Sequence, residues 1–460
     1  MRLFSILWIL LCGLNFLSSQ LAFFGTTPLG IEPKLKYPNA PLPVIPSSSI
    51  GVEPFTANKE FVLGSIKSFP RGTSCGRNGL HAQHILDALS ASASAIADEL
   101  LNSITAVVNL LLAGRFPPQL REYIASAPLT PLLKPDGGIR PIVVGTIWRR
   151  LVYKVAALRV CKHMSAYLSD IQFGVGIPCV GEAILHSVNR LQSDKGNCSS
   201  MSMLLVDFRN DFNLIDRTSM ILEVRRKCPS ISRWVEFCYS SPVRLYYGSH
   251  TISSSQGVQQ GDSLGPLLFS LTLHPIVLKI SRVCDLDLQA WYLDEGTLIG
   301  DTLMVSKYLH IIREEGSLVG RDINIHKTEL FLPTVDVRST MAFVFPADID
   351  RPALGAKLLG GPVSLGPLFC NKLVSARVNK TLQLMDVIQS LKDQQIEMQL
   401  FWSCCGVSKI YFTLRTTVPD FVKEAQTIFG CRLFNFFQQL FIWDGPGFGD
   451  LQMRVASFPV

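Results

Sequence analysis

Two short segments that end in carboxylates constrain the fold of this chain more than any other feature. Residues 203–206 are apolar and Asp207 follows them directly, which predicts a buried strand with a carboxylate at its tip. Residues 290–299 have the pattern of two short strands around the acidic turn Asp294-Glu295, which predicts a β-hairpin. Taken alone, a strand-end aspartate is usually a helix cap or turn residue, and an acidic hairpin turn is usually just solvated.

Three further segments accompany these carboxylates. Residues 256–266 form a glycine-rich turn before an apolar run, a pattern that lets the backbone approach a ligand closely. Residues 133–142 form a basic, hairpin-like turn that carries Lys134 and Arg140. Lys327 follows a short apolar segment further along the chain. Each segment alone is a weak indication of function, whereas the five segments in this order are a strong one.

Composition excludes several classes of protein. The 460 residues are 48% hydrophobic and 17% charged, which excludes a disordered tail or a disulfide-rich miniprotein and predicts two or three domains. The net charge of +7 permits a polyanionic partner without requiring one. The 12 cysteines form no C-x-x-C pair, so we expect buried free thiols, including the adjacent Cys404 and Cys405.

Composition and periodicity divide the chain into five regions. We expect an apolar leader at 1–25, a Pro/Ser-rich linker at 26–54, a helical N-terminal extension at 55–130, a mixed α+β region at 131–333 and a mainly helical region at 334–460. The linker composition predicts extended, poorly packed chain. Apolar residues from Ile85 to Leu111 recur at steps of three and four and predict one helical face that ends at Gly114. Residues 378–391 suit an amphipathic helix.

The leader is open to three interpretations. Residues 3–17 have the length and apolar character of a signal-peptide core, but residues 18–22 offer no clean cleavage site. The segment is therefore a signal peptide, a single membrane anchor, or an unrelated leader joined to an intracellular domain by gene rearrangement.

The ordered motifs resemble those of reverse transcriptases, closest to the retroelement-derived, non-LTR-like proteins common in plant genomes. The resemblance extends over about residues 61–459 and includes a turn at 358–364 that is similar to the family's primer grip. It rests on R-P-I at 140–142, D-F-R-N-D-F-N at 207–213, G-V-Q-Q-G-D at 257–262, Y-L-D-E-G at 292–296 and N-I-H-K-T-E at 324–329.

The resemblance implies an α+β fold, the palm and fingers of a right-hand polymerase, with an antiparallel sheet and helices. The fingers and palm would span 131–333, and the primer grip and a partial, thumb-like helical region would span 334–460. The relatives continue past residue 459, so we expect the chain to end within the thumb.

The resemblance also implies template-directed nucleotidyl transfer by a two-metal mechanism. Such chemistry needs carboxylates from neighbouring strands to clamp the two metals, and Mg²⁺ or Mn²⁺ suits hard oxygen ligands. Asp207 and Asp294 would bind metal, and Glu295 would be the second carboxylate of the hairpin. Lys327 would be the general acid for the pyrophosphate leaving group.

Five further residues would bind the nucleotide by the same resemblance. Phe212 would be a steric gate that collides with a ribose 2′-hydroxyl, and Gln260 and Gly261 would line the incoming nucleotide and template. Lys134 and Arg140 would bind triphosphate oxygens. The expected partners are deoxynucleoside triphosphates and an RNA or DNA template with its primer, in the nucleus or cytoplasm, and no obligate protein partner is inferred.

Three residues depart from the family pattern. Glu295 stands where relatives carry an aspartate, and its extra methylene pushes the carboxylate outward, which predicts weakened activity. Asp211 replaces a small apolar residue, and we expect its charge to oppose nucleotide entry. Ser263 replaces a proline, a minor loosening of the turn. The alternatives are therefore a catalytically decayed retroelement relic that at most binds nucleic acid and, from the leader, a secreted or membrane-anchored protein.

Overall fold

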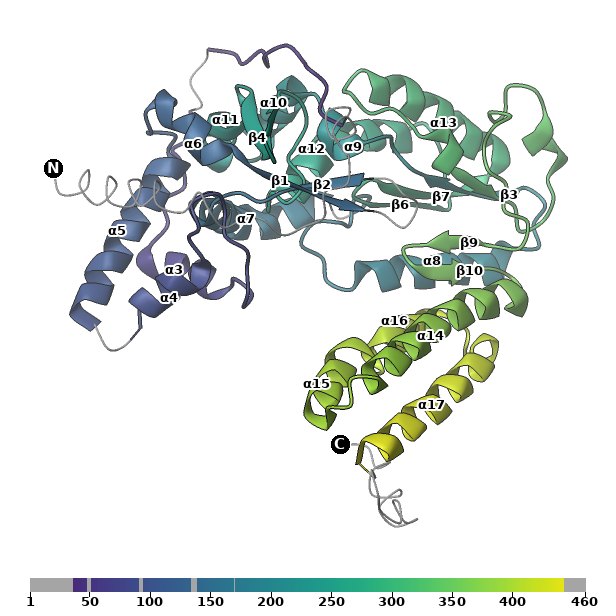
Figure 1. Cartoon of the computed structure of the whole chain (residues 1–460). Coiled ribbons are helices and arrows are strands. Elements are labelled where there is room, and N and C mark those ends of the chain that lie inside the picture. The colour runs from purple at the N-terminus through teal and green to yellow at the C-terminus, as the bar shows by residue number, and fades with distance from the viewer. Residues whose placement is uncertain (1–35, 48–50, 91–93, 134–138, 169, 442–460) are drawn as a thin grey trace.

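The computed structural model describes residues 36–47, 51–90, 94–133, 139–168 and 170–441 (Figure 1). The leader expected at 1–25 lies outside the described residues. No helix in the described part of the chain is long and apolar enough to span a membrane. The cysteines of these segments are free thiols, but only some are buried as expected: Cys405 is buried and Cys404 half-buried, whereas Cys179, Cys198 and Cys431 are exposed.

A four-stranded antiparallel sheet in the order β6-β7-β3-β8 forms the palm. Its strands are β3 (Met201–Val206), β6 (Leu288–Tyr292), β7 (Glu295–Asp301) and β8 (Glu329–Phe331). The hairpin expected at 290–299 is present as β6 and β7, and β7 also pairs with β3 over the whole length of β3.

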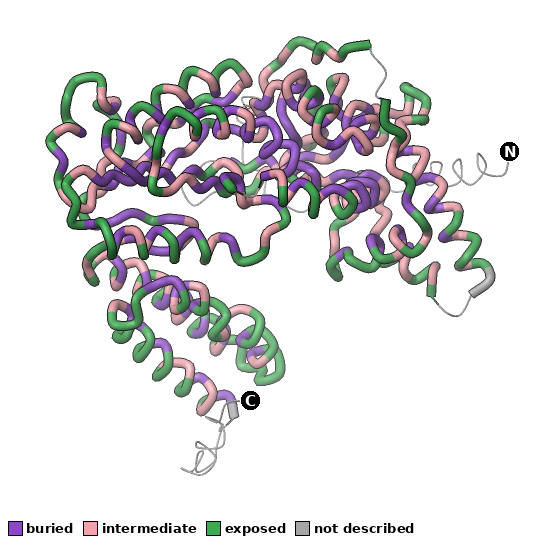
Figure 2. Tube along the Cα trace, turned by 180° about the vertical axis from the view of Figure 1, so that it is seen from behind, coloured by how far each residue is buried: buried purple, intermediate pink, exposed green. Residues whose placement is uncertain are grey.

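Both faces of the palm sheet are covered. Met201 and Met203 of β3 pack in a cluster with residues of α8 (Val180–Lys195), whereas Leu204 and Val206 pack in the main core with residues of α13 (Thr302–Ser317). Alternate strand residues point to opposite faces, so β3 is buried between two layers of helices. This explains its continuous apolar sequence, and Figure 2 shows the buried trace running through the middle of this part of the molecule.

A second sheet, in the order β2-β1-β4-β5, forms the fingers. Its strands are β1 (Ala127–Leu133), β2 (Ile139–Val143), β4 (Val243–Tyr247) and β5 (His250–Ser254). β1 and β2 form the hairpin that the sequence predicts, and β1 is parallel to β4. Five further helices alternate with the strands of the two sheets along the chain: α7 (Ile147–Leu168), α9 (Asp211–Leu214), α10 (Arg217–Lys227), α11 (Pro229–Tyr239) and α12 (Gly265–Ser281).

The N-terminal region is helical, but the single helical face expected from Ile85 to Leu111 is wrong. The region contains α3 (Lys59–Lys67), α4 (Ala82–Ala88), α5 (Ser94–Leu112), the 3₁₀ turn η3 (Pro118–Leu120) and α6 (Arg121–Ala125). The apolar spacing continues across the break between α4 and α5, but Ile96 of α5 is exposed. Spacing alone does not detect where a helix breaks.

Residues 36–47, part of the expected linker, form no helix or strand and are packed only at their start. Tyr37 is buried in a small cluster with Leu129 and Val143 of the fingers sheet. The backbone is held by side chains of the palm, since Asn210 Nδ2 donates to Lys36 O (2.9 Å) and Arg225 Nη1 donates to Pro46 O (2.8 Å). The prediction of a poorly packed linker therefore fails at Tyr37, whereas the exposed Leu42 and Val44 agree with it.

The C-terminal region is a hairpin followed by a helical bundle. β9 (Ala356–Leu358) and β10 (Gly361–Val363) form the turn that the sequence places at 358–364. The bundle contains α14 (Pro367–Gln389), α15 (Gln394–Cys404), α16 (Ser408–Thr416), the turn η6 (Pro419–Phe421) and α17 (Lys423–Phe441). Helix α14 spans most of the amphipathic segment expected at 378–391. The bundle has its own core, in which Val378, Met385 and Phe401 are buried.

Candidate active site

The palm sheet brings Asp207 and Asp294 to one edge. β3 and β7 are antiparallel, and Val206 lies opposite Gly296. Asp207 follows β3 directly, and Asp294 lies in the turn that precedes β7. Because antiparallel neighbours place the end of one strand beside the start of the other, the two carboxylates meet at the same edge. The sequence predicts each position, and the strand register brings the two together.

The turn that carries Asp294 is held by Gln172, a residue to which the sequence assigns no role. Gln172 is fully buried, and its Oε1 accepts hydrogen bonds from Leu293 N (2.9 Å) and Gly174 N (3.1 Å). Its Nε2 donates to Leu293 O (3.1 Å). Leu293 has a φ of 57°, a left-handed conformation that is costly for leucine. Gln172 therefore fixes a strained residue next to Asp294.

Glu295 lies on the same edge as Asp294, at the first position of β7, and its residue is exposed. Desolvation of the carboxyl raises its pKa, and the negative charges of Asp294 and Asp207 raise it further. The negative charges of Asp207, Asp294 and Glu295 therefore gather at one edge of the sheet.

A second segment fixes the backbone beyond Asp207. Asn324 N donates to Asp207 O (2.8 Å), and Arg209 N donates to Asp322 O (2.8 Å). Lys327 lies three residues after Asn324, in the 3₁₀ turn η4 (Ile325–Lys327), and is exposed. The predicted general acid is thus carried by a segment that is hydrogen-bonded to the Asp207 backbone.

Asp211 does not act as the sequence predicts. Its side chain is buried, and Arg321 Nη1 lies 2.9 Å from Asp211 Oδ2 in an ion pair that excludes solvent. Burial raises the pKa of Asp211 to about 7, Arg321 opposes this shift, and Asp294 and Asp207 add to it. The expectation that Asp211 repels an entering nucleotide is wrong, because a buried guanidinium compensates its charge.

Phe212 lies in α9, five residues after Asp207 in the sequence, and is half-buried. Its carbonyl accepts a hydrogen bond from Val258 N (2.7 Å), and its ring stacks on that of Phe269. Gly257 permits this contact, since a Cβ there would lie 2.2 Å from Asn213 C and the φ of Gly257 is 67°. The glycine-rich turn thus packs directly against the helix that carries Phe212.

The other end of the glycine-rich turn contacts the fingers. Val143 N donates to Gln260 O (2.7 Å), and a Cβ on Gly261 would lie 2.5 Å from Val143 O. Gln260 is half-buried and Gly261 is exposed, so both are accessible beside the fingers sheet. Arg140 lies three residues before Val143 on β2 and is exposed. The predicted cation Lys134 lies outside the described residues.

Arg149 supports the glycine-rich turn from the protein interior, a role that the sequence does not predict. Arg149 is a buried residue of α7 whose Nη1 donates to Gln259 Oε1 (2.6 Å). Its Nη2 lies 3.7 Å from Asp262 Oδ2, and the Tyr239 hydroxyl also donates to that carboxylate. The residues on either side of Gln260 and Gly261 are therefore anchored in the interior. One arginine among 43 basic residues gives no sequence signal of such a role.

The carboxylates fit a divalent metal, although within the described segments no three His, Cys, Asp or Glu side chains form a closed metal site. Mg²⁺ is usually bound by one or two protein carboxylates and completes its shell with water and substrate phosphates. Asp207 and Asp294 provide such a pair of hard oxygen donors at an accessible edge.

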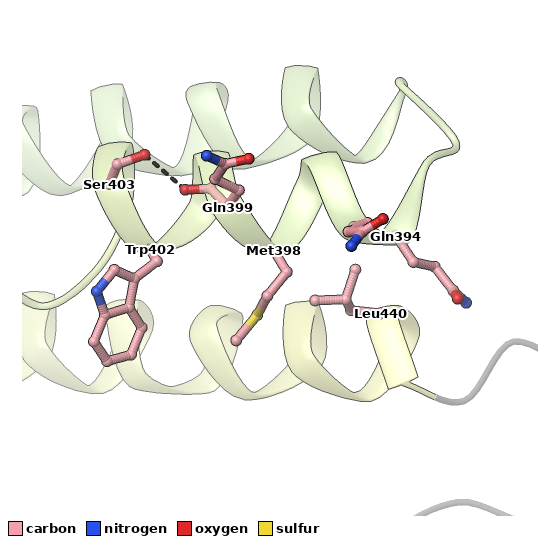
Figure 3. A pocket seen from close by; sticks show the side chains of 7 residues that line it. Gln394, Met398, Gln399, Trp402, Ser403 and Leu440 are labelled. Carbon is pink, nitrogen blue, oxygen red and sulfur yellow. Dashed lines mark hydrogen bonds between the residues drawn. The ribbon is translucent and has the colours of Figure 1, made fainter. Parts of the chain in front are cut away.

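A groove of about 710 Å³ lies elsewhere, between α15 and α17 of the C-terminal bundle (Figure 3). Its lining includes Met398, Trp402 and Leu440. Figure 1 places these helices in the bundle, apart from the palm sheet, so the groove is not part of the carboxylate site.

A palm sheet with paired carboxylates at its edge, next to a fingers sheet and followed by a helical bundle, is the α+β architecture of a right-hand polymerase. A family model described as reverse transcriptase (RNA-dependent DNA polymerase) matches residues 132–363, half of the chain. The chain belongs to the reverse transcriptase family.

The chain is also similar to a retrotransposon protein. It is 28% identical over 240 residues to the retrotransposable element SLACS 132 kDa protein of Trypanosoma brucei gambiense. The match covers 51% of this chain and 20% of that protein, so the chain spans about a fifth of the length of this relative.

Two solved telomerases are distant structural neighbours. The enzyme of Candida albicans, in complex with a fragment of telomeric RNA, has a TM-score of 0.41 and 11% identity over 75% of this chain and 66% of its own. The apo enzyme of Candida tropicalis has a TM-score of 0.35 and 15% identity over 45% of this chain and 50% of its own. Similarity this low adds nothing to the functional assignment.

Proposed function

We propose that this chain carries out template-directed nucleotidyl transfer as an RNA-directed DNA polymerase of retroelement origin. The observation that carries the proposal is the meeting of Asp207 and Asp294 at one edge of the palm sheet, in a chain of the reverse transcriptase family. The finer assignment, to the non-LTR-like elements of plants, rests on the motif resemblance alone.

Asp207 and Asp294 hold the metal in this proposal. When bound, Mg²⁺ or Mn²⁺ would stabilise negative charge on the attacking and leaving oxygens. Gln172 orients Asp294 by fixing the Leu293 backbone. Lys327 Nζ donates a proton to the pyrophosphate leaving group.

The nucleotide lies between palm and fingers. The ring of Phe212 faces the sugar and disfavours a ribose 2′-hydroxyl. Gln260 and Gly261 line the base pair between nucleotide and template, and Arg140 and Lys134 bind triphosphate oxygens. The primer and its RNA or DNA template are held by the hairpin β9–β10 and the helical bundle that follows it.

Primer extension with the full chain tests this function. We would measure deoxynucleotide incorporation on a primed RNA template with Mg²⁺ or Mn²⁺, using Asp294→Asn as the blank. The matched control is Asp285→Asn, an exposed aspartate in the loop before β6. We expect Asp285→Asn to match the parent and Asp294→Asn to abolish incorporation.

Glu295→Asp tests whether the hairpin substitution weakens the site. A carboxylate placed about 1 Å closer could raise the rate by up to about 10²-fold. Asp211→Ala is not a restoring change, because it would leave Arg321 buried without its partner. If the folded parent and Glu295→Asp are both silent with either metal, the chain is a relic and the proposed function is rejected.

A further inference from the structure

Arg321 is a fully buried arginine that reaches the helix carrying Phe212. Its Nη1 donates to Asp211 Oδ2 (2.9 Å), and Asp211 immediately precedes Phe212. Its Nη2 donates to the carbonyl oxygen of Phe269 on α12 (2.8 Å). The guanidinium carbon also lies 4.0 Å from the centroid of the Phe269 ring. One side chain therefore binds both a carboxylate of α9 and the backbone and ring of α12.

Phe269 connects this arginine to Phe212. The two phenylalanine rings stack with centroids 4.7 Å apart and an angle of 26° between their planes. The contacts therefore form a ring of four residues. Phe212 stacks on Phe269, Phe269 contacts the Arg321 guanidinium, Arg321 pairs with Asp211, and Asp211 is the chain neighbour of Phe212. Together these contacts restrict the position of the Phe212 side chain more than any single contact does.

The Arg321 backbone is itself fixed to the α9 region. Asp216 N donates to Val319 O (3.1 Å), Arg209 N donates to Asp322 O (2.8 Å), and a Cβ on Gly320 would lie 2.2 Å from Leu214 O. The residues on both sides of Arg321 therefore pack against residues on both sides of Asp211 and Phe212. Because its backbone is fixed in this way, Arg321 cannot easily move its guanidinium to follow a displaced Phe212 ring.

Electrostatics explains why this contact matters. Asp211 lies in the interior near Asp207 and Asp294, and removing its partner would leave a buried carboxylate uncompensated. Such a group takes up a proton, moves toward water or draws water inward, and in each case its bond to Arg321 is gone. Without the bond between Asp211 and Arg321, α9 is no longer tied to Phe269 of α12, and Phe212, the residue next to Asp211, is free to shift.

We propose that Arg321, through its ion pair with Asp211 and its contact with Phe269, is a positioning residue that sets how strongly Phe212 excludes ribonucleotides. The proposal rests on the proposed function, in which Phe212 faces the sugar. It predicts that sugar selectivity depends on an arginine that contacts neither the nucleotide nor the metal.

The test measures selectivity in two independent ways. kcat/KM for dCTP and for CTP is obtained by primer extension with the full chain at pH 8. The Kd of each nucleotide is obtained with Mg²⁺ on a primer that ends in a dideoxynucleotide, so binding is measured without chemistry. Phe212→Val serves as the reference for an absent gate.

Four variants separate positioning from folding. Arg321→Met removes the charge and both hydrogen bonds, and Arg321→Lys keeps the charge but not the forked donor geometry. The double variant Asp211→Ala with Arg321→Met removes the ion pair without leaving a buried charge, so it remains informative if Arg321→Met does not fold. Arg225→Met is the matched control, since it removes the ion pair with Glu236 on α10 and α11.

We expect the preference for dCTP to fall at least about tenfold in Arg321→Met and in the double variant, toward that of Phe212→Val. Arg321→Lys should be intermediate, and Arg225→Met should equal the parent. Folded variants with the parent's dCTP/CTP ratio would overturn the positioning role and leave the proposed function intact. A parent that neither extends primers nor binds nucleotide would reject both.

Discussion

One side chain, that of Gln172, satisfies both polar backbone groups of Leu293. Leu293 N lies 2.9 Å from Gln172 Oε1, and Leu293 O lies 3.1 Å from Gln172 Nε2. Leu293 adopts a left-handed conformation one residue before Asp294. Backbone strain persists where the surroundings over-determine it, and here it determines where the Asp294 carboxylate lies, which the proposed function assigns to the metal.

Gln172→Ala should therefore reduce catalysis more than stability. We expect nucleotide incorporation to fall by about 10²-fold, because the Asp294 turn loses its support. The free energy of unfolding should fall by only about 1–3 kcal/mol, from the unsatisfied Leu293 groups. Primer extension and urea unfolding measure the two effects. Gln192→Ala removes the same side chain from a buried position on α8, and an equal loss of activity there would contradict the role of Gln172.

Gly257→Ala should destabilise the protein strongly. The added Cβ would lie 2.2 Å from Asn213 C, and the left-handed φ of Gly257 is unfavourable for alanine. We expect a loss of about 3 kcal/mol or more of unfolding free energy, at the upper end for overpacking. Gly64→Ala is the control, because nothing lies within 4 Å of its added Cβ in helix α3, and it should gain about 0.5–1 kcal/mol. Similar losses in both variants would exclude the steric explanation.

Asp211 and Arg321 should show strong coupling in a double-mutant cycle. Asp211→Ala and Arg321→Met should each cost about 3–5 kcal/mol, because each leaves a buried charge without its partner. The double variant should lie within about 1–2 kcal/mol of the parent, since apolar replacement of a whole buried pair is often neutral. Urea unfolding of the four proteins measures the coupling. Additive losses would show that the two residues act independently.

Tyr37 should stabilise the fold although it lies in a proline-rich segment. Tyr37→Ala removes a buried ring from the cluster with Leu129, Val143 and Leu245 and should cost about 3–5 kcal/mol. Tyr37→Phe removes only a hydroxyl that lies 3.5 Å from Pro141 O and should cost about 1 kcal/mol at most. Thermal unfolding compares the two. A Tyr37→Ala protein as stable as the parent would mean that residues 36–47 do not pack on the fingers in solution.

The sequence predicts those parts of the site that depend on local pattern. The apolar strand before Asp207, the hairpin around Asp294 and the glycine-rich turn at 256–266 all have short-range signatures, because strand alternation and turn chemistry are properties of neighbouring residues. The same reasoning fails at the α4–α5 break, where the apolar spacing continues from one helix into the next.

The predictions about Asp211 and about Tyr37 fail because both depend on contacts between distant residues. Asp211 and Arg321 are 110 positions apart, and Tyr37 reaches Pro141 across 104 positions. No local pattern marks a charge as compensated or a proline-rich stretch as packed, since both properties depend on which residues tertiary folding brings alongside.

Local sequence is enough to recognise the family, the strand-end positions of Asp207 and Asp294 and the glycines of the turn, because these are encoded within a few consecutive residues. The contacts between Gln172 and Leu293, between Arg149 and the turn and between Arg321 and Asp211 become visible in the folded chain alone. Each of these contacts involves a buried polar group, and the free energy of a buried polar group depends on partners that the chain supplies from far away.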